Sequence, residues 1–475
     1  DKKRLKRRIW RATVIKKNGT CLWIMLLLFN LLFAGCSQSS SSHESLPLNS
    51  QNLNLIFVVS PDLAYQGKGD INPETANLSS QGLQRSLLMA TYLKQKVLGG
   101  NNVTSIYALQ PNTHLQTEND YPDMASYGYI QQFALLNQIT LNSITAYSYP
   151  IKMSSAGAGK GLNFYNTAGN LELVNAVIDA NTPGYYVFCA PWETISALLD
   201  AIKNSRGYHL ELPTTYQGPD NIYAIVISTS GNASLVTYIS NLNPPSIYPV
   251  LPLPVARTAC GQQAPFNINR TGGVNGVVVP TGMNVNQTVY IIRHAEAHPV
   301  NGWEDGNFVG SGQWRALELP NALRGKITMP DKVYSIDPSL PIPPAGTVDF
   351  SYIRPSLTAL PYAIANNLPY QLALLPDFYQ ISTFQTTSEF FFTGGAFSNQ
   401  TLLVAWEHDH IPPTINYLLW TYGGTGERID PKVWLSADYD TIWTIRLDAQ
   451  GNLTVDNSLC EGIDSASLPA APPQY

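Results

Sequence analysis

Charged side chains are scarce in this chain of 475 residues: they make up 13% of it, about half of the roughly 25% usual in soluble domains. Cysteine is scarcer still. The five cysteines form no CxxC pair and no Cys/His cluster with zinc-binding spacing, which argues against a structural zinc site. What the chain does have is length. Because 475 residues exceed what a single hydrophobic core usually supports, we expect two folded units.

The amino-terminal residues have the pattern of an export signal. A basic run, "DKKRLKRRIWRATVIKK", precedes the apolar segment "CLWIMLLLFNLLFAG", residues 21–35. This segment has the length of a signal-peptide core and is shorter than the ~20 residues of a membrane-spanning helix. It ends in "LFAGC", which resembles the lipobox of bacterial lipoproteins. The resemblance implies cleavage after residue 35 and lipidation of Cys36, although an uncleaved anchor or a plain signal peptide are alternatives.

The same resemblance predicts a location. The lipid on Cys36 would anchor the chain to a bacterial membrane in the cell envelope, facing the periplasm or the exterior. The serine-rich residues 36–51 would then form a flexible tether.

Removal of the leader makes the chain strongly acidic. Residues 1–35 contain nine of the 28 basic and one of the 33 acidic residues, so 19 basic residues remain against 32 acidic ones, a net charge of −13. This balance argues against nucleic acid or an anionic bilayer surface as the main partner. Any phosphate site must therefore be a local feature.

Two cysteines flank the second half of the chain. Cys189 lies in the apolar run "YYVFCA", where a buried thiol is expected. Cys260 and Cys460 remain, and they could form a disulfide in an oxidising compartment.

The two halves of the chain follow one order of similar segments. "LIFVVSPDLA" from Leu55 matches "TVYIIRHAEA" from Thr288, an offset of 233, and five further pairs follow, ending with Asp220 against Asp440. Short apolar runs alternate with helical stretches in both halves, the pattern of parallel βα units. We therefore predict an α/β fold with two tandem three-layer α/β/α domains and mostly parallel central sheets. The predicted segments are a first domain at 52–243, a proline-rich linker at 244–285, a second domain at 286–463 and a tail at 464–475.

Two apolar runs of the second half end on histidine. "VYII" leads into Arg293 and His294, and "LLVAWE" leads into His408; between them, "SYIRPSLTA" supplies Arg354 just before a predicted helix. Ligands of parallel α/β sheets bind beyond the carboxyl ends of the strands. If the two strands are neighbours, two imidazoles and two guanidinium groups should converge.

This set of residues resembles the histidine phosphatase superfamily, which includes the cofactor-dependent phosphoglycerate mutases and the histidine acid phosphatases. The resemblance rests on "RHAE" after a buried strand, an intervening Arg354 and a second strand-end histidine. It implies two phosphoglycerate-mutase-like domains and hydrolysis of a small phosphorylated substrate. His294 would form a phosphohistidine, with Arg293, Arg354 and His408 binding the phosphate oxygens. Since guanidinium groups can neutralise these oxygens, no metal or cofactor is needed.

The proton donor for the leaving group is open between two carboxyls. Asp409 follows the second histidine, as in the acid phosphatase branch, whereas Glu389 in "TTSEFFF" lies nearer to where the mutase-like branch keeps its acid. Either group would need burial to raise its pKa toward the working pH.

The first half lacks all four phosphate ligands. In the alignment, Ser60, Pro61, Gly128 and Pro191 stand where the second half has Arg293, His294, Arg354 and His408. We expect a degenerate copy that folds but cannot transfer phosphate. It could be a scaffold that packs on the catalytic copy as an intramolecular pseudo-dimer, or a module that recognises cell wall, glycan or protein.

Two other interpretations stay open. The chain could be a non-catalytic surface protein in which both copies are binding modules. His408 and His410 in "WEHDH" suggest a metal pair, but no third ligand is evident in the sequence.

Overall fold

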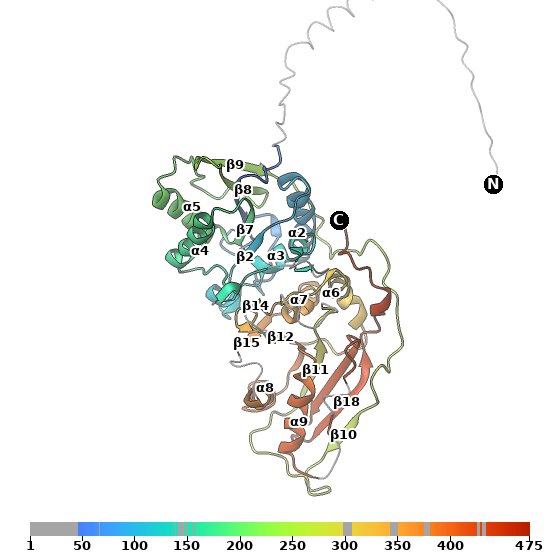
Figure 1. Ribbon diagram of the computed structural model, residues 1–475. Coiled ribbons are helices and arrows are strands. Elements are labelled where there is room, and N and C mark those ends of the chain that lie inside the picture. Colours follow the sequence, from blue (N-terminus) through green and yellow to red (C-terminus); the bar gives the residue numbers. More distant parts are fainter. Residues whose placement is uncertain are drawn as a thin grey trace, which may run out of the picture. The chain divides into compact units, whose positions relative to one another are not determined.

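A computed structural model describes most of the chain from Leu46 onward (Figure 1). Cys36, the leader 1–35 and most of the tether lie outside the described residues. Within the part of the chain that is described, no helix is long and apolar enough to cross a membrane. The described ranges are 46–65, 67–137, 139–140, 147–148, 151–154, 157–297, 306–342, 350–374, 381–424, 428–429 and 434–475.

The first half forms a five-stranded mixed sheet. Its first three strands are parallel and its last two are antiparallel. The segments "LNLIFVV" and "GYYVFCA" are buried throughout, as expected for strands covered on both faces. In spatial order the strands are β2 (Ser105–Ala108), β7 (Gly184–Ala190), β1 (Leu53–Val59), β8 (Asn221–Ile227) and β9 (Ala233–Ile239).

The second half forms a seven-stranded mixed sheet whose five inner strands repeat the first sheet in order and direction. In spatial order they are β10 (Asn267–Arg270), β18 (Leu453–Cys460), β17 (Thr441–Leu447), β11 (Gln287–Arg293), β16 (Thr401–Trp406), β12 (Lys332–Ile336) and β15 (Tyr370–Ala373). β11, β16, β12 and β15 run parallel, while β17, β18 and β10 pair antiparallel. The prediction of mostly parallel sheets is correct for the four strands that lead to the site.

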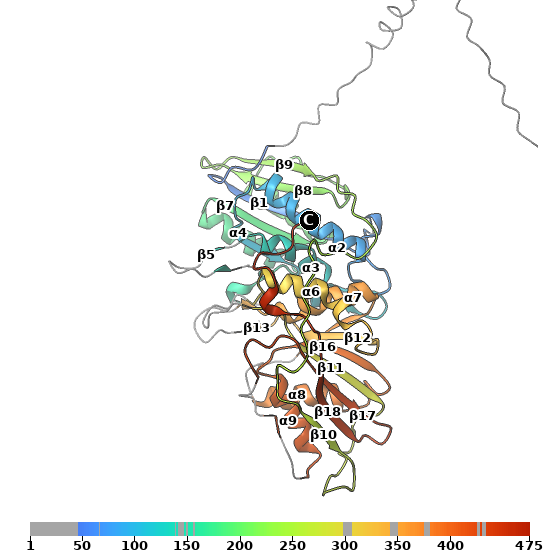
Figure 2. The ribbon, with the colours of Figure 1, turned by 90° about the vertical axis from the view of Figure 1, so that its right-hand side faces the viewer.

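Helices cover both faces of each sheet, so each half has the predicted three layers (Figure 2). Alternate residues of β11 face opposite cores: Tyr290 and Ile292 pack toward one helical layer, Val289 and Ile291 toward the other. The first sheet lies between α2 (Ser80–Tyr92) with α3 (Ala125–Leu135) and α4 (Thr167–Ala180) with α5 (Trp192–Arg206). The second lies between α6 (Gly310–Leu323) with α7 (Arg354–Asn366) and α8 (Ile381–Phe392) with α9 (Ile411–Thr421).

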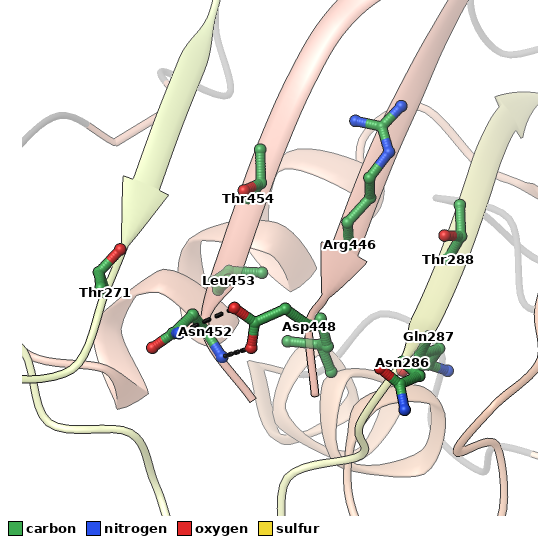
Figure 3. A pocket seen from close by; sticks show the side chains of 10 residues that line it. Thr271, Asn286, Gln287, Thr288, Arg446, Asp448, Asn452, Leu453 and Thr454 are labelled. Atoms are coloured by element: carbon green, nitrogen blue, oxygen red, sulfur yellow. Dashed lines mark hydrogen bonds between the residues drawn. The ribbon is translucent and has the colours of Figure 1, made fainter. Parts of the chain in front are cut away.

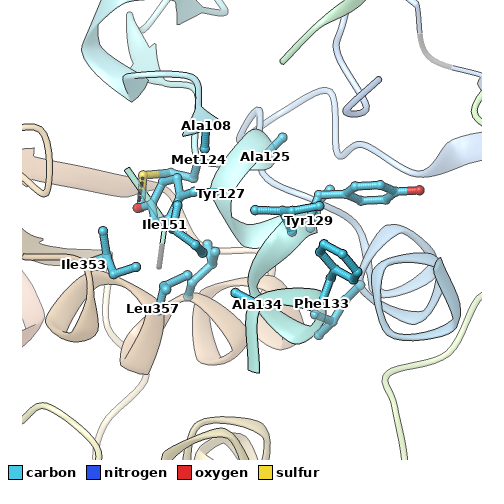
Figure 4. Packing of buried hydrophobic residues seen from close by; sticks show 14 of the residues in the cluster. Ala108, Met124, Ala125, Tyr127, Tyr129, Phe133, Ala134, Ile151, Ile353 and Leu357 are labelled. Carbon is cyan, nitrogen blue, oxygen red and sulfur yellow. Dashed lines mark hydrogen bonds between the residues drawn. The ribbon is translucent and has the colours of Figure 1, made fainter. Parts of the chain in front are cut away.

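The inner helices of the two halves share one core. Tyr127 of α3 and Met124, which directly precedes α3, pack in the same buried cluster as Leu357 of α7 and the preceding Ile353 (Figure 4). Residues Leu46–Tyr475 accordingly form one compact unit. The described residues therefore contain two large sheets, but these do not belong to two separately packed domains.

Two segments lie closer to the sheets than expected. β10 falls inside the range 244–285 predicted as a linker, and it pairs with β18. The predicted tail 464–475 packs against both halves: Gln132 Nε2 donates to the Pro473 carbonyl at 2.6 Å, and Trp314 Nε1 donates to the Ala471 carbonyl at 2.8 Å.

A disulfide joins Cys260 to Cys460, with Cα atoms 5.4 Å apart. It fastens the segment before β10 to the end of β18. Cys189 is a buried free thiol. Short elements complete the chain: helical turns at Gly67–Gly69, Leu93–Val97, Pro111–Thr113, Gly157–Gly159 and Ser465–Ser467, and strands β3 (Leu115–Gln116), β4 (Tyr121–Pro122), β5 (Ile139–Thr140), β6 (Tyr147–Ser148), β13 (Pro341–Ile342) and β14 (Phe350–Ser351).

Candidate active site

The two strands that end on histidine are adjacent and parallel, as the sequence predicted. β11 pairs with β16 along its length, and the backbone N–H of His294 donates to the Trp406 carbonyl at 2.9 Å. The carboxyl ends of both strands therefore coincide. The rings of His294 and His408 lie with their centroids 6.2 Å apart and nearly perpendicular.

His294 is held as a neutral imidazole. Its Nδ1 lies 2.8 Å from the Ala295 carbonyl oxygen, and a carbonyl can only accept, so Nδ1 carries a proton; in the neutral ring this leaves the electron pair on Nε2. The ring is 2% exposed. Burial, together with the charges of Arg354 and Arg293, holds the pKa of His294 well below its ordinary value. An unprotonated Nε2 is what a nucleophilic histidine requires.

Arg293 is anchored by the turn before β17. Its Nη1 donates to the carbonyls of Ser436 and Asp438 at 2.9 and 3.0 Å, and its guanidinium lies over the Tyr439 ring, 3.9 Å from the centroid. Its Nε is buried and has no hydrogen-bond partner among the described residues. Because an unpaired buried donor is costly, this N–H is available to an acceptor oxygen.

Arg354 is the first residue of α7 and is buried. Its guanidinium lies 4.9 Å from the centroid of the Tyr352 ring, and that ring meets His294 edge-on at 6.2 Å. The positive charges of Arg293 and Arg354 both lower the pKa of His294. The structure thus brings together all four residues that the sequence selected.

Glu407 completes the group, and sequence reasoning missed it. This buried carboxylate pairs with Nδ1 of His408 and with Nδ1 of His410 at 2.9 Å, and it accepts the backbone N–H of Asp409 at 2.7 Å. Burial alone would raise the pKa of Glu407, but the bonds from the two histidines hold it well below its ordinary value. An ionised Glu407 is therefore the acidic neighbour of both His408 and His410. The signal was present, since Glu407 stands directly before His408 in "WEHDH".

Neither predicted proton donor has the burial that we expected. The Asp409 side chain is 75% exposed, with its Oδ1 3.5 Å from His408 Nε2. Glu389 is exposed on α8, where Gln385 and Tyr417 donate to its Oε1 at 2.8 and 3.2 Å. Glu389 lies on α8, which packs against α9. Of the two predicted proton donors, only Asp409 therefore lies beside the histidines.

Three of these residues could also serve as ligands of a metal ion. His294, Glu407 and His408 each offer a ligand atom, and these atoms lie within 4.8 Å of one another. Two guanidinium groups, however, act on the same imidazole. Since neighbouring positive charges oppose a cation and favour an anion, the arrangement fits a phosphate better than a metal ion.

A described pocket lies elsewhere. It has a volume of about 430 Å³ and includes Gln287 and Thr288, at the opposite end of β11 from His294 (Figure 3). Its lining is polar, with Asp448 held by Asn452 at 2.8 Å and Arg446 paired with Asp456 at 2.8 Å. It contains none of the candidate catalytic residues.

The strand register corrects the alignment of the two halves by one residue. The Ser60 N–H donates to the Ala190 carbonyl at 3.0 Å, just as His294 donates to Trp406. Ser60 therefore corresponds to His294, and Val59 to Arg293, an offset of 234 instead of 233. The same register places Pro191 and Trp192 opposite Glu407 and His408, so the first sheet has no imidazole at either position.

Comparisons with known proteins add little. No family model matches the chain, and no curated protein matches it. Solved structures that resemble it include a phosphoglycerate mutase from Plasmodium falciparum, with 16% identity and a TM-score of 0.25 over 40% of this chain and 99% of that one. Proteins described as the phosphohistidine phosphatase SixA also match. The one from Agrobacterium tumefaciens has 14% identity and a TM-score of 0.22 over 34% of this chain and 92% of its own. The one from Nakamurella multipartita has 16% identity and a TM-score of 0.24 over 41% and 96%. At such low scores these likenesses establish no activity.

Proposed function

We propose that this chain is a metal-independent phosphomonoester hydrolase that works through a phosphohistidine at His294. One observation carries the proposal: a buried imidazole with a free Nε2 lies within the field of two arginines and beside His408. The set provides a nucleophile and a cationic surround for one tetrahedral anion.

The reaction would have two displacements. Nε2 of His294 attacks phosphorus and the bond to the leaving oxygen breaks, while Arg293, Arg354 and His408 bind the other phosphate oxygens. Because Asp409 is exposed, with its Oδ1 3.5 Å from His408 Nε2, the proton that the leaving oxygen takes up would come from this carboxyl or from solvent water beside it. Water then attacks the phosphohistidine and the N–P bond breaks. The proton that this water loses returns to the Asp409 carboxylate or to solvent, inorganic phosphate leaves, and Nε2 is free again.

The first half would be an inactive copy that serves as a scaffold. Two features support this role: the shared order of five strands and a hydrophobic core common to both halves. The export signal and Cys36 would place the enzyme on a lipid anchor in the bacterial envelope, where small phosphorylated molecules would be its substrates.

The test is hydrolysis of an aryl phosphate by the full chain. We expect His294→Ala to lower kcat/KM by roughly 10⁴-fold or more, whereas His209→Ala, which removes an exposed histidine of the first half, should change nothing. Labelled phosphate should be trapped on the wild type as an acid-labile, base-stable adduct and be absent from His294→Ala.

Two outcomes would contradict the proposal. Equal rates for wild type and His294→Ala would favour the non-catalytic binding protein. Loss of activity in EDTA, restored by a divalent cation, would favour the metal set of His294, Glu407 and His408.

A further inference from the structure

The segment that leads into Arg354 is held by the first half of the chain. Ser351, the last residue of β14, is 1% exposed. Its Oγ accepts the backbone N–H groups of Met153 and Ser154, both at 2.7 Å, and donates to the Gly159 carbonyl at 3.1 Å. These partners come from the other half, 192 to 198 residues away in sequence.

The three bonds use the full capacity of the hydroxyl. A serine hydroxyl has one proton to donate and two lone pairs that accept, and all of them are engaged here. Gly159 permits the close approach: a Cβ at this position would lie 3.3 Å from backbone atoms of Phe350 and 3.2 Å from Ser154 Cβ. The contact is therefore specific in both hydrogen bonding and shape.

The other side of this segment is fixed by the second half itself. The Gly306 carbonyl accepts the N–H groups of Ile353 and Arg354 at 3.0 and 2.9 Å. A Cβ on Gly306 would lie 1.7 Å from the Ser351 carbonyl oxygen, and its φ is +75°. Residues 351–354 are thus clamped between Gly306 on one side and Met153, Ser154 and Gly159 on the other.

Only two residues separate Ser351 from Arg354 of the proposed phosphate site. Arg354 follows Ser351 by three positions, and Tyr352, which contacts both Arg354 and His294, follows it directly. A second contact joins the halves near the same edge of the sheet: Asn112 Nδ2 donates to Asp337 Oδ2 at 2.5 Å, and Asp337 follows the end of β12. The first half therefore touches the edge where the catalytic group lies.

We propose that Ser351 is a positioning residue through which the first half sets Arg354 and Tyr352 in the phosphate-binding geometry. This inference rests on the function proposed above and gives the first half a defined role in it: the second half binds phosphate fully only when backbone groups of Met153, Ser154 and Gly159 hold Ser351. The role is carried by backbone groups of the first half, so its loss of catalytic side chains does not impair it.

The experiment measures phosphate binding and turnover in the full chain. In Ser351→Ala the Met153 N–H loses its partner and residues 351–354 can shift. We expect affinity for inorganic phosphate, by titration calorimetry, to fall about 10-fold, and kcat/KM for an aryl phosphate to fall roughly 10- to 100-fold. Ser351→Thr, which keeps the hydroxyl, should recover most of both. Gly159→Ala, a change in the first half alone, should weaken phosphate binding in the same direction.

The matched control is Asn77→Ala. Asn77 Nδ2 donates to the Leu368 carbonyl at 3.1 Å, a buried bond between the halves at the opposite end of α7. A general loss of stability would affect this variant as well, whereas the positioning role predicts normal phosphate affinity in it, with folding of every variant checked by thermal unfolding.

The outcomes separate the two proposals. If wild type binds phosphate and Ser351→Ala binds it equally well, the positioning role is wrong and the proposed function stands. A parallel loss in Ser351→Ala and Asn77→Ala would also overturn the positioning role. If wild type binds no inorganic phosphate, both proposals fail.

Discussion

The two sheets share five strands in one order and direction, yet at the two corresponding strand ends only the second has histidine and arginine. At corresponding strand ends, the second sheet has Arg293 and His294 where the first has Val59 and Ser60. Ser60 bonds Ser126 across 2.8 Å, a contact that ties strand to helix. Strand pairing and core packing depend on apolar residues inside the sheet, so the residues just beyond the strands can change without loss of the fold.

Both halves retain one polar feature, a buried arginine on the first helix. Arg85 binds Asp70 and Asp220 at 2.6 and 2.9 Å. Arg315 binds Glu296 at 2.8 Å and also contacts Glu461, with Asp440 3.6 Å away. Each network ties its helix to the start of the fourth strand of the pattern. The comparison separates residues that folding needs, which are present in both halves, from residues that the proposed catalysis would need, which are present in one.

The largest effect is expected on stability, from substitution of these two arginines. Arg85→Met and Arg315→Met should each lower the free energy of unfolding by about 3–5 kcal/mol, because each leaves buried carboxylates without their partner. Because the halves share a core, urea should unfold each variant in one transition. Lys68→Met is the control: Lys68 pairs with Asp220 but its side chain is 54% exposed, so we expect a loss of at most about 1 kcal/mol. Equal effects of Arg85→Met and Lys68→Met would contradict the prediction.

The next-largest effect is expected on activity, from a substitution that gives the second half a residue of the first. Arg293→Val introduces the residue found at the corresponding position, Val59, and removes one guanidinium from the anion site. We expect kcat/KM for an aryl phosphate to fall roughly 10²- to 10³-fold without loss of the fold. Arg446→Val on β17, whose arginine is 45% exposed, should keep full activity. If the two variants behave alike, Arg293 does not bind phosphate.

The smallest effect is a difference in proton affinity between two histidines. For His294, burial and two arginines lower the pKa. For His114 in the first half, burial alone would lower the pKa. The bond to Asp123 at 3.0 Å and the nearby charge of Asp62 outweigh burial and raise the pKa above its ordinary value. NMR titration of the ring protons, assigned with His294→Asn and His114→Asn, should place His294 below 6.5 and His114 above it. The reverse order would contradict the electrostatic description of both sites.

These shifts have opposite effects on stability. Below about pH 6.5 the unfolded chain takes up a proton that folded His294 refuses, so this residue makes the protein less stable as the pH falls. His114 contributes stability that is present below about pH 6.5 and is lost as the pH rises through its folded value.

Much of the fold and of the candidate site could be predicted from the sequence. The buried runs, the ordered segment pairs and the strand-end histidines were sufficient to predict two similar sheets and the meeting of His294 with His408. The alignment of the two halves was still wrong by one residue. Apolar strands of similar composition can be aligned almost equally well at neighbouring offsets, and only the hydrogen-bond register of each sheet distinguishes these offsets. Tyr352, Tyr439 and Glu407 were missed, since an aromatic ring or a single carboxylate beside a strand has no pattern of its own. The prediction that Asp409 or Glu389 is buried was wrong, because the exposure of both side chains depends on how α8 and α9 pack.

By itself, the sequence determined which residues are buried in strands and which histidines and arginine stand at the ends of those strands. It also determined that only the second half has these residues there. Local hydrophobic pattern and chain order are enough for that. Only the tertiary structure decided that the halves share one core, that Glu407 lies beside His408, and that Ser351 meets backbone groups 192 to 198 residues away. Such contacts depend on how whole layers pack in space, and their geometry is set by the surrounding core instead of by neighbouring residues in the chain.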